Sequence, residues 1–456
     1  MRKYLPIIII AAVSLIVHFA YFGQPKETVF DEVHFGKFIS GYFTGNYFFD
    51  IHPPLGKLLL SGMGWLGGFQ PGFSFTEIGQ QFPDNIYLWL RFLPTLAGAL
   101  LPVVIFYLAL QLGLSRLAAF AAGMLVALDN ALLTQSRYIL LDSFLLLFGF
   151  AALLFYTKYW RSHNLKPKTY HLFLAGVLGA LAVSVKWTGG TFLAIIVFFE
   201  IIKLLKNKNF QSALKPTIFL LVIPFVIYFS IFAVHLKLLT KSGPGDAFMT
   251  PTFQKTLAGN PQAGNLDIEP ASLFQKFIEL NLQMYSANAR LTAGHPYSSQ
   301  WYTWPFMARP VYYWNETLPG NQINYTPARI YFLGNPVVWW GSTVAVLYFL
   351  LTLIPAFSGN RDKEKLAMAL LGAYFLNLLP FIGIKRAMFL YHYLTALIFA
   401  ILILVYLVDK LPARKKIFTG LLLAGLVSFI YFAPLSYGLP ISEPAYNARV
   451  WFPSWR

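Results

Sequence analysis

Cysteine is absent from the 456-residue chain, which excludes disulfide bonds and thiolate chemistry. Charge is scarce as well: Asp, Glu, Lys and Arg make up 12% of the residues, about half the share found in soluble domains. Acidic residues are the scarcer kind, with 18 Asp and Glu against 35 Lys and Arg, so the net charge is +17. With 57% hydrophobic residues and a mean hydropathy of +0.58, this composition is typical of a membrane protein.

Several motifs of soluble enzymes are missing too. There is no Walker-type glycine loop and no dinucleotide-binding fingerprint, so a cytosolic nucleotide is not expected as a ligand. The histidines and acids do not follow a metal-ligand spacing, so we expect no metal and no other cofactor. The positive charge lies mostly in short loops between apolar runs, which favours an orientation signal in a membrane over nucleic-acid binding.

Apolar runs of about 20 residues, the length that crosses a bilayer, recur along the chain. Helices satisfy every backbone hydrogen bond in lipid, and the alternating segments of a transmembrane β-barrel are missing. We therefore predict an all-α polytopic membrane protein. Its eleven spans are expected at residues 4–22, 86–111, 116–134, 138–158, 170–186, 188–206, 214–236, 336–357, 364–382, 387–408 and 415–433.

The loops between these spans differ in charge on the two sides. The chain begins with Arg2 and Lys3, and from there every second connection is short and basic, as expected of cytoplasmic loops. The first apolar run lacks a small-residue cleavage site, so we interpret it as a retained span and not as a signal peptide. The N-terminus is thus predicted to be cytoplasmic, within a single transmembrane domain of residues 1–456. Three aromatic-rich external segments are predicted at residues 23–85, 237–335 and 434–456.

The first external loop contains the densest polar segment of the chain, residues 30–57. Apolar residues recur there at helical spacing, which predicts an amphipathic helix in the membrane interface. Residues 54–69 form a second apolar segment, which is too short and too rich in glycine to span and is interpreted as interfacial or re-entrant. The apolar positions of the amphipathic helix are Phe35, Phe38, Ile39 and Tyr42.

Ionisable residues within apolar spans are costly, at about 2.5–3.5 kcal/mol each, and are commonly functional. Here they gather at the predicted outer ends of the spans, where any single one could extend its charge to the interface. Their concentration at one depth indicates instead a polar site open to the outside. The set consists of Arg91, Arg137, Asp142, Lys186, Arg386 and His392 on the spans, with Asp31, Glu32, His34, His52 and Lys57 in the first loop.

The two acids of this set are adjacent, so on a helix Asp31 and Glu32 point about 100° apart and cannot act on the same atom. We expect one to act as a base and the other to hold a substrate or a helix. Asp31 is also well placed to cap a helix N-terminus. The basic residues of the set suit a phosphate group, and a phosphate beside an apolar wall indicates a polyprenyl phosphate that carries a sugar.

Residues 30–57, FDEVHFGKFISGYFTGNYFFDIHPPLGK, resemble the first external loop of the protein O-mannosyltransferases, a dolichyl-phosphate-mannose family of the GT-C class. The combination of DE with HPPLGK is the most specific part of the resemblance. The likeness continues through LDNALLTQSRYILLDSFLLLF (128–148), VKWTGG (185–190), GHPYSSQWYTWPFMARPVYYW (294–314), GNPVVWW (334–340) and KRAMFLYHYL (385–394).

The resemblance implies an inverting transfer of mannose from polyprenyl-phosphate-mannose to Ser or Thr hydroxyls of translocated proteins. It implies Asp31 as the catalytic base with Glu32 as a supporting acid. Arg91 would lie at the lipid phosphate, and Asp142 in a second acidic motif. The expected partners are this donor, protein acceptors delivered by the Sec translocon and the lipids of the cell membrane, but no nucleic acid. Residues 237–335 are too few to hold the β-trefoil MIR domain of eukaryotic members, which indicates a minimal prokaryotic form.

Two other functions fit parts of the pattern. A GT-C transferase that uses another polyprenyl-phosphate sugar, or a lipid or glycan acceptor, would share the topology and the base. A lipid or solute transporter would place its polar groups near the bilayer midplane between repeated halves. Here the polar groups gather at one face and no repeat is visible, so the transporter is the more remote alternative.

Overall fold

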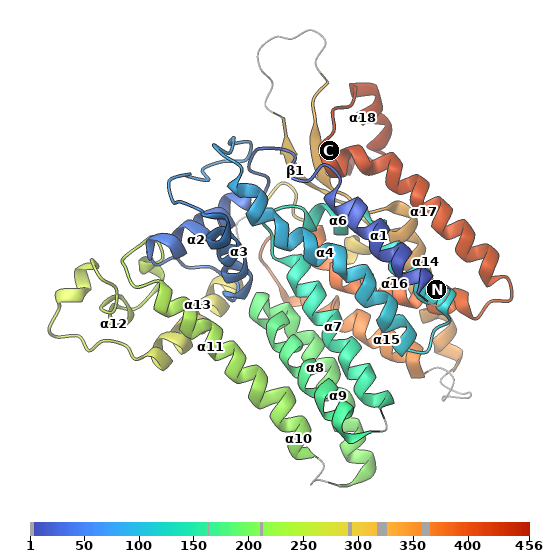
Figure 1. Cartoon of the computed structure of the whole chain (residues 1–456), viewed down its shortest axis with the longest axis horizontal. Coiled ribbons are helices and arrows are strands. Elements are labelled where there is room, and N and C mark those ends of the chain that lie inside the picture. Colours follow the sequence, from blue (N-terminus) through green and yellow to red (C-terminus); the bar gives the residue numbers. More distant parts are fainter. Residues whose placement is uncertain (1–3, 163, 210–212, 291–293, 317–325, 357–364) are drawn as a thin grey trace.

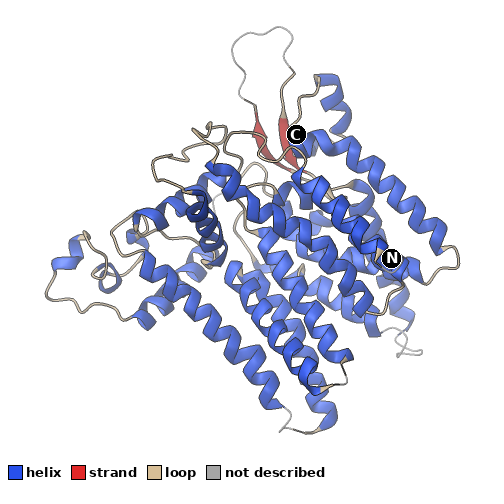
Figure 2. Cartoon of the chain, in the orientation of Figure 1, coloured by secondary structure: helices blue, strands red, loops and turns tan. Residues whose placement is uncertain are grey.

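The structure is a computed structural model in which long helices run side by side in one bundle (Figure 1). The only strands among its described residues form one short hairpin at the edge of the bundle (Figure 2). The strongly helical architecture agrees with the predicted all-α class. The structure describes residues 4–456 except 163, 210–212, 291–293, 317–325 and 357–364.

Eight helices in the described part of the chain are long and apolar enough to cross a membrane. A ninth candidate is the pair α5 (Arg116–Ala127) and α6 (Asn130–Ser136), which bends by 57°. The bend has a local cause, because Asp129 interrupts the helix and caps α6 by accepting a hydrogen bond from the Leu132 amide at 2.9 Å. The eight are α4 (Ile86–Gln111), α7 (Asp142–Arg161), α8 (Leu165–Val185), Trp187–Asn207 with α9 (Gly190–Asn207), Leu214–Leu238 with α10 (Leu214–Thr217) and α11 (Ile223–Leu238), Lys365–Gly383 with α15 (Lys365–Leu376), Leu390–Asp409 with α16 (Leu394–Asp409), and α17 (Arg414–Tyr437).

The remaining two predicted spans also fall on apolar helices. These are α1 (Leu5–Phe19) and α14 (Pro336–Ala356). Helix α1 and the apolar part of α14, Pro336–Thr352, are both shorter than a typical span. Each of the eleven predicted segments thus corresponds to a helix or a bent pair, while the number that cross the membrane stays a prediction. Arg2 and Lys3, on which the predicted orientation begins, lie outside the described residues.

The bundle has a buried centre and lipid-facing sides. Helix α16 forms the centre. In the span Leu390–Asp409, 83% of the residues of the apolar stretch are buried, and α16 packs against α5, α14 and α15. By contrast, only 17% of the residues in the apolar stretch of α10–α11 and 22% of those in the apolar stretch of α17 are buried, although both stretches are about as apolar as that of α16. Helices that are apolar all round and yet uncovered by protein need a hydrocarbon environment. The chain is accordingly a multi-pass membrane protein.

The first long loop folds into two short helices, α2 (Glu32–Thr44) and α3 (Leu55–Gly67). Helix α2 ends at Gly45, whose φ of 79° gives the left-handed cap that glycine adopts most easily. Helix α3 has 13 residues and so extends about 20 Å, too short to span a bilayer, as the sequence predicts.

The apolar stripe of α2 differs from the expectation. Phe35, Ile39 and Tyr42 are buried by the protein itself, whereas the sequence suggests a helix that rests on the membrane interface. The covering residues come from distant segments: Phe48 packs edge-on to the Tyr42 ring, and His235 of α11 lies 2.7 Å from the Tyr42 hydroxyl. Helix α2 is therefore part of the protein core.

The long loops and the C-terminal segment contact one another. The Lys241 amide donates to the Gly45 carbonyl at 2.9 Å, and the Tyr47 amide donates to the Lys241 carbonyl at 2.8 Å, which joins the two loops. The Tyr331 and Tyr446 hydroxyls lie 2.6 Å apart and join the second loop to the C-terminal segment. The remaining elements of these segments are α12 (Pro251–Gln254), α13 (Leu273–Arg290), the antiparallel strands β1 (Val311–Asn315) and β2 (Arg329–Phe332), and α18 (Glu443–Arg449).

Candidate active site

The chain makes a constrained turn just before α2. Phe30 has a φ of 48°, an uncommon backbone conformation for a residue with a side chain. Its amide donates to the Tyr313 carbonyl at 3.1 Å, and its ring stacks on the Tyr313 ring with centroids 4.1 Å apart. Strand β1 of the second loop thereby fixes the point at which α2 begins, and with it the position of Asp31 and Glu32.

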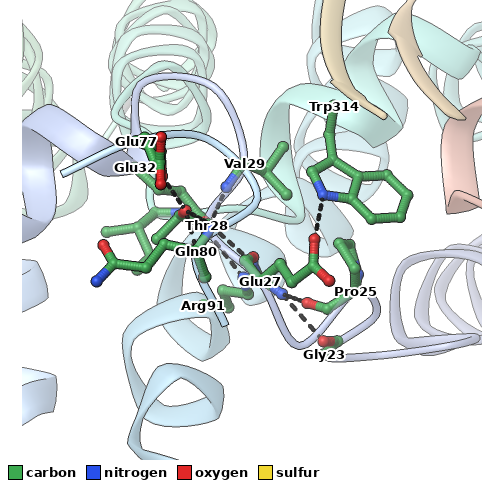
Figure 3. Close-up of polar contacts among 11 residues, drawn as sticks. Gly23, Pro25, Glu27, Thr28, Val29, Glu32, Glu77, Gln80, Arg91 and Trp314 are labelled. Carbon is green, nitrogen blue, oxygen red and sulfur yellow. Dashed lines mark hydrogen bonds and ion pairs between the residues drawn. The ribbon is translucent and has the colours of Figure 1, made fainter. Parts of the chain in front are cut away.

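Glu32 is fully buried and has all of its acceptor positions occupied by protein donors. The Val29 amide donates to Oε2 at 2.8 Å and the Ile139 amide to Oε1 at 2.9 Å. Arg91 of α4 donates to both oxygens, from Nε at 2.8 Å and from Nη2 at 2.7 Å. Figure 3 shows this pair beside the loop that leads into α2. Glu32 thus joins the first loop to α4 and to the segment before α7.

Arg91 is expected from the sequence at a lipid phosphate, but its surroundings give it a different role. Besides the two bonds to Glu32, it donates to the carbonyls of Gly23, Pro25 and Glu27 at 2.6–3.0 Å (Figure 3). All five guanidinium N–H donors therefore have protein acceptors, and the side chain is 0% exposed. No donor remains for a phosphate, so Arg91 holds the loop together.

Two further predicted phosphate or substrate ligands are also occupied by the protein. Arg137 donates to backbone carbonyls at the end of α1, those of His18, Ala20 and Tyr21, at 2.6–2.7 Å. Lys57 forms an ion pair with Asp50 and donates to the His52 carbonyl at 2.7 Å. Both side chains are almost completely buried. Each holds a backbone segment in place.

Asp31 has different surroundings from Glu32. It occupies the N-cap position of α2, but its carboxylate accepts no capping hydrogen bond, which removes the alternative that it serves as a cap. Among the described residues no hydrogen bond or ion pair to this carboxylate is formed, and the side chain is half-buried. Burial raises the pKa of Asp31 to about 7; the Lys186 ammonium opposes this rise, and the Asp142 and Asp50 carboxylates add to it.

A hydrogen-bonded chain of side chains lies next to Asp31. Lys186, between α8 and α9, donates to Asp142 Oδ1 at 2.8 Å. Gln135 of α6 donates to Asp142 Oδ2 at 2.6 Å and accepts from the Tyr313 hydroxyl at 2.5 Å. Burial, assisted by the Asp31 and Asp142 carboxylates, holds the pKa of Tyr313 well above its usual range, so the phenol stays a donor. This chain fixes the Lys186 ammonium in the neighbourhood of Asp31.

The other predicted site residues surround this chain. Burial and the cations Lys186, Lys57 and Arg386 hold the pKa of His52 well below its usual range, so the imidazole is neutral. Burial likewise lowers the pKa of Arg386, and its guanidinium has no hydrogen-bonding partner among the described residues. His392 stacks on Trp304 with ring centroids 5.8 Å apart.

His34 lies at the rim of the cluster. Its side chain is exposed, and its pKa is lowered, chiefly by partial burial and by Lys37. The structure therefore brings together Asp31, Asp142, Lys186, His52, Arg386 and His392, with His34 at the edge.

Sequence reasoning missed four residues of the cluster: Asp50, Gln135, Tyr313 and Tyr391. All four lie inside the segments that carry the family resemblance, which is the signal that could have found them. Tyr391 contributes its ring, which lies 5.5 Å from the Lys186 ammonium. The cluster as a whole combines a carboxylate of raised pKa with two cations, an arrangement suited to removing a proton and stabilising an anionic leaving group. No group of three His, Asp or Glu suited to a metal occurs in the described part of the chain.

The fold defines a polytopic membrane protein of the GT-C class. Over 100% of this chain and 93% of the other, it superposes with a TM-score of 0.92 and 22% identity on the Saccharomyces cerevisiae protein O-mannosyltransferase Pmt1-Pmt2 complex bound to the sugar donor. The chain belongs to the dolichyl-phosphate-mannose–protein mannosyltransferase family, whose family model matches residues 8–240. A model of the C-terminal four-transmembrane region of protein O-mannosyltransferases matches residues 273–455.

Curated relatives agree with this assignment. Protein O-mannosyl-transferase 1 of Mus musculus is 37% identical over 270 residues, which cover 56% of this chain and 36% of the relative. Dolichyl-phosphate-mannose–protein mannosyltransferase 4 of Candida albicans is 37% identical over 279 residues, which cover 58% of this chain and 37% of the relative. The matched part is thus little more than a third of the length of these relatives.

Proposed function

We propose that the chain transfers mannose from a polyprenyl-phosphate-mannose donor to Ser or Thr hydroxyls of proteins. Membership of the family and the names of its relatives support the donor and the acceptor class. The observation that carries the chemical step is Asp31, a half-buried carboxylate of raised pKa that has no protein partner among the described residues and lies near the Lys186 cation. A base with a pKa near the working pH is the most effective kind.

In the proposed step, Asp31 takes the proton of the acceptor hydroxyl while the hydroxyl oxygen forms a bond to the anomeric carbon of mannose. The bond between that carbon and the phosphate oxygen breaks, and polyprenyl phosphate leaves with the electron pair. Attack opposite to the leaving group inverts the anomeric configuration. Lys186 and Arg386 stabilise the charge that develops on the phosphate. Glu32, Arg91 and Lys57 keep the loop in position and do not touch the substrate.

We further propose that this step takes place outside the cytoplasm. The short basic connections predict a cytoplasmic N-terminus and an outward-facing site in the cell membrane, with acceptors that arrive through the Sec translocon. The same site could use another polyprenyl-phosphate sugar, because the charges of the cluster at Asp31 suit the phosphate that such donors share. Parallel assays with polyprenyl-phosphate-mannose and polyprenyl-phosphate-glucose distinguish these possibilities.

The test is mannosyl transfer by the Asp31→Asn variant to a Ser/Thr peptide. We expect the rate to fall by about 100-fold or more, the usual contribution of a general base. Glu77→Gln, which alters an exposed acid of the same loop, serves as the matched control and should retain full activity.

The stability of Asp31→Asn separates catalysis from folding. The pKa of Asp31 is raised in the folded state from 3.8 to about 7, so the ionised carboxylate costs stability at pH values above this range. Asparagine removes that cost, and the variant should unfold at the same or a higher temperature at about pH 8. Near-normal turnover by a stable Asp31→Asn protein would overturn the assignment of the base.

A further inference from the structure

A large apolar cavity lies at the opposite end of the bundle from Asp31. Its volume is about 1410 Å³, larger than the 300–1,000 Å³ typical of sites for drug-sized molecules. Helices α7, α9, α15 and α16 form its walls, with apolar residues such as Phe198, Ile202 and Leu402. Lys206 on this cavity is 20 residues along the chain from Lys186 of the candidate site, or about 30 Å along a helix. This distance matches the thickness of a bilayer core.

The end of the cavity farthest from Asp31 is basic. Lys168, Lys203, Lys206 and Lys365 all line it, and no acidic residue occurs among its described lining residues. Among the described residues, Glu200 lies beside this end of the cavity, and Lys203 already neutralises it through an ion pair of 3.0 Å. The described residues at this basic end, which we call the mouth of the cavity, therefore carry a net excess of positive charge.

The lysines of the mouth are arranged around aromatic rings. Besides its ion pair with Glu200, the Lys203 ammonium donates to the Tyr159 hydroxyl at 2.6 Å, and the Lys168 ammonium lies over the ring of the same tyrosine at 5.3 Å. Trp160 is about half exposed, as expected of an aromatic residue in the interfacial layer. The exposed Lys206 has no partner among the described residues. The basic end is thus at headgroup level, and the apolar part lies in the hydrocarbon.

The other end of the cavity is closed toward the candidate site. Ala194 and Leu376 are among its lining residues, and just beyond them the Thr191 hydroxyl of α9 donates to Asn377 Oδ1 at 2.7 Å. This bond joins α9 to the end of α15 between the cavity and Lys186. We therefore expect an occupant to place its charged group at the basic end.

We propose that this cavity binds an anionic diacyl phospholipid of the leaflet opposite to the candidate active site. The acyl chains lie between α9 and α15, and the phosphate is held by Lys168, Lys203 and Lys206. Basic pockets between transmembrane helices are known to select anionic headgroups, and the apolar depth of this one accounts for the chains. The proposal does not depend on the function of the Asp31 cluster.

The test uses purified full-length protein in phosphatidylcholine vesicles that contain a phosphatidylglycerol with a photoreactive group in one acyl chain. After illumination, mass spectrometry locates the adducts, which we expect on α9 and α15. Removal of Lys206 or of Lys168 by substitution with alanine should each lower the adduct yield about fivefold at limiting probe. The double variant Lys415→Ala/Lys416→Ala removes two exposed lysines of α17 that are not part of the cavity and should leave the yield unchanged.

A second pair of variants tests the apolar part. Gly372 lines the cavity, and a Cβ atom there would meet no protein atom within 4 Å, so Gly372→Leu narrows the cavity without a clash at Cβ. Gly420 of α17 is equally unobstructed, and Gly420→Leu is the matched control. We expect Gly372→Leu to lower the adduct yield and Gly420→Leu to leave it unchanged, with unfolding temperatures unchanged in both.

Two results would overturn the proposal. Equal labelling by a photoreactive phosphatidylcholine would mean that the lysines select no headgroup. Labelling of the same helices by photoreactive polyprenyl phosphate, unaffected by the lysine variants, would mean that the cavity holds the tail of a donor from the other leaflet. In either case the function proposed for Asp31 is unaffected, because the mannosyl-transfer assay tests it separately.

Discussion

The adjacent carboxylates of Asp31 and Glu32 have opposite surroundings. Glu32 accepts four hydrogen bonds and is inaccessible, whereas Asp31 accepts none from the described residues and keeps a pKa of about 7. Because the two side chains leave the helix in different directions, one can face the core while the other faces the substrate. The two acids therefore have different surroundings, while the division of labour expected from the sequence and catalysis by Asp31 stay predictions.

The raised pKa of Asp31 predicts how activity depends on pH. A base must be ionised to accept a proton, so kcat/KM should rise with pH and level off above about 7. The measurement is the rate of mannosyl transfer at limiting substrate between about pH 5 and about pH 9. A profile that is flat through this range would show that the ionisation of Asp31 does not control the reaction.

Arg91 and Arg386 should respond differently to substitution. Arg91→Ala leaves Glu32 buried without its partner, which should destabilise the protein by about 3–5 kcal/mol. The Arg386 guanidinium donates no hydrogen bond to an acceptor among the described residues. Arg386→Ala should therefore preserve stability and raise the apparent KM for the sugar donor. Thermal unfolding in detergent, together with donor titrations, measures both. A stable Arg91→Ala variant with a raised donor KM would restore the phosphate role expected from the sequence.

The sequence identifies the residues of the site more reliably than their roles. Asp31, Asp142 and Lys186 are found because ionisable groups are conspicuous among apolar spans. The role of Arg91 is not predictable in the same way, because three of its acceptors are backbone carbonyls of the loop 23–27. Every residue has a backbone carbonyl, so the sequence does not indicate which of them accept a hydrogen bond. Gln135 and Tyr313 are missed because neutral polar side chains in such a chain carry no comparable signal.

At the scale of elements, the two long external loops depend on each other through close backbone contact. A Cβ atom on Gly245 would lie 2.5 Å from the carbonyl carbon of Phe48, closer than atoms approach without displacement of the backbone. The segment at Phe48 leads directly to Asp50 and His52. The second loop thus supports the part of the first loop that lies beside Asp31.

Gly245→Ala should therefore separate the loops and lower both stability and the transfer rate. Gly264→Ala is the matched control, because it lies in the same external loop and a side chain there would meet nothing within 4 Å. Comparison of unfolding temperature and turnover for the two variants is the measurement. If Gly245→Ala behaves like Gly264→Ala, the contact between the loops is dispensable.

The elements themselves are only partly predictable. Helical spacing correctly predicts α2, but the burial of its apolar stripe depends on Phe48 and on His235, which is far along the chain. The hairpin β1–β2 is not predicted, since its strands are short and pair across a long intervening segment. Local periodicity reports which face of a helix is apolar, and it does not report whether protein or lipid covers that face.

At the scale of the whole molecule, the absence of cysteine allows a direct test of the orientation. Lys37→Cys places a single thiol at an exposed position of α2, and Lys416→Cys places one at an exposed position near the start of α17. We expect a membrane-impermeant maleimide to label the first in intact cells and the second only after the membrane is opened. The reverse pattern would put the candidate site in the cytoplasm and contradict the proposed topology.

The connection of Glu32 to Arg91 also determines how much the proposed base can move. The Cα atom of Asp31 lies about 3.8 Å from that of Glu32, one peptide unit away from a residue tied to α4. Its thermal displacement is therefore that of a rigid transmembrane helix, even though it belongs to a long external loop. We expect the segment that carries Asp31 to stay in place while donor and acceptor enter, because Glu32 is tied to α4 and Phe30 to Tyr313.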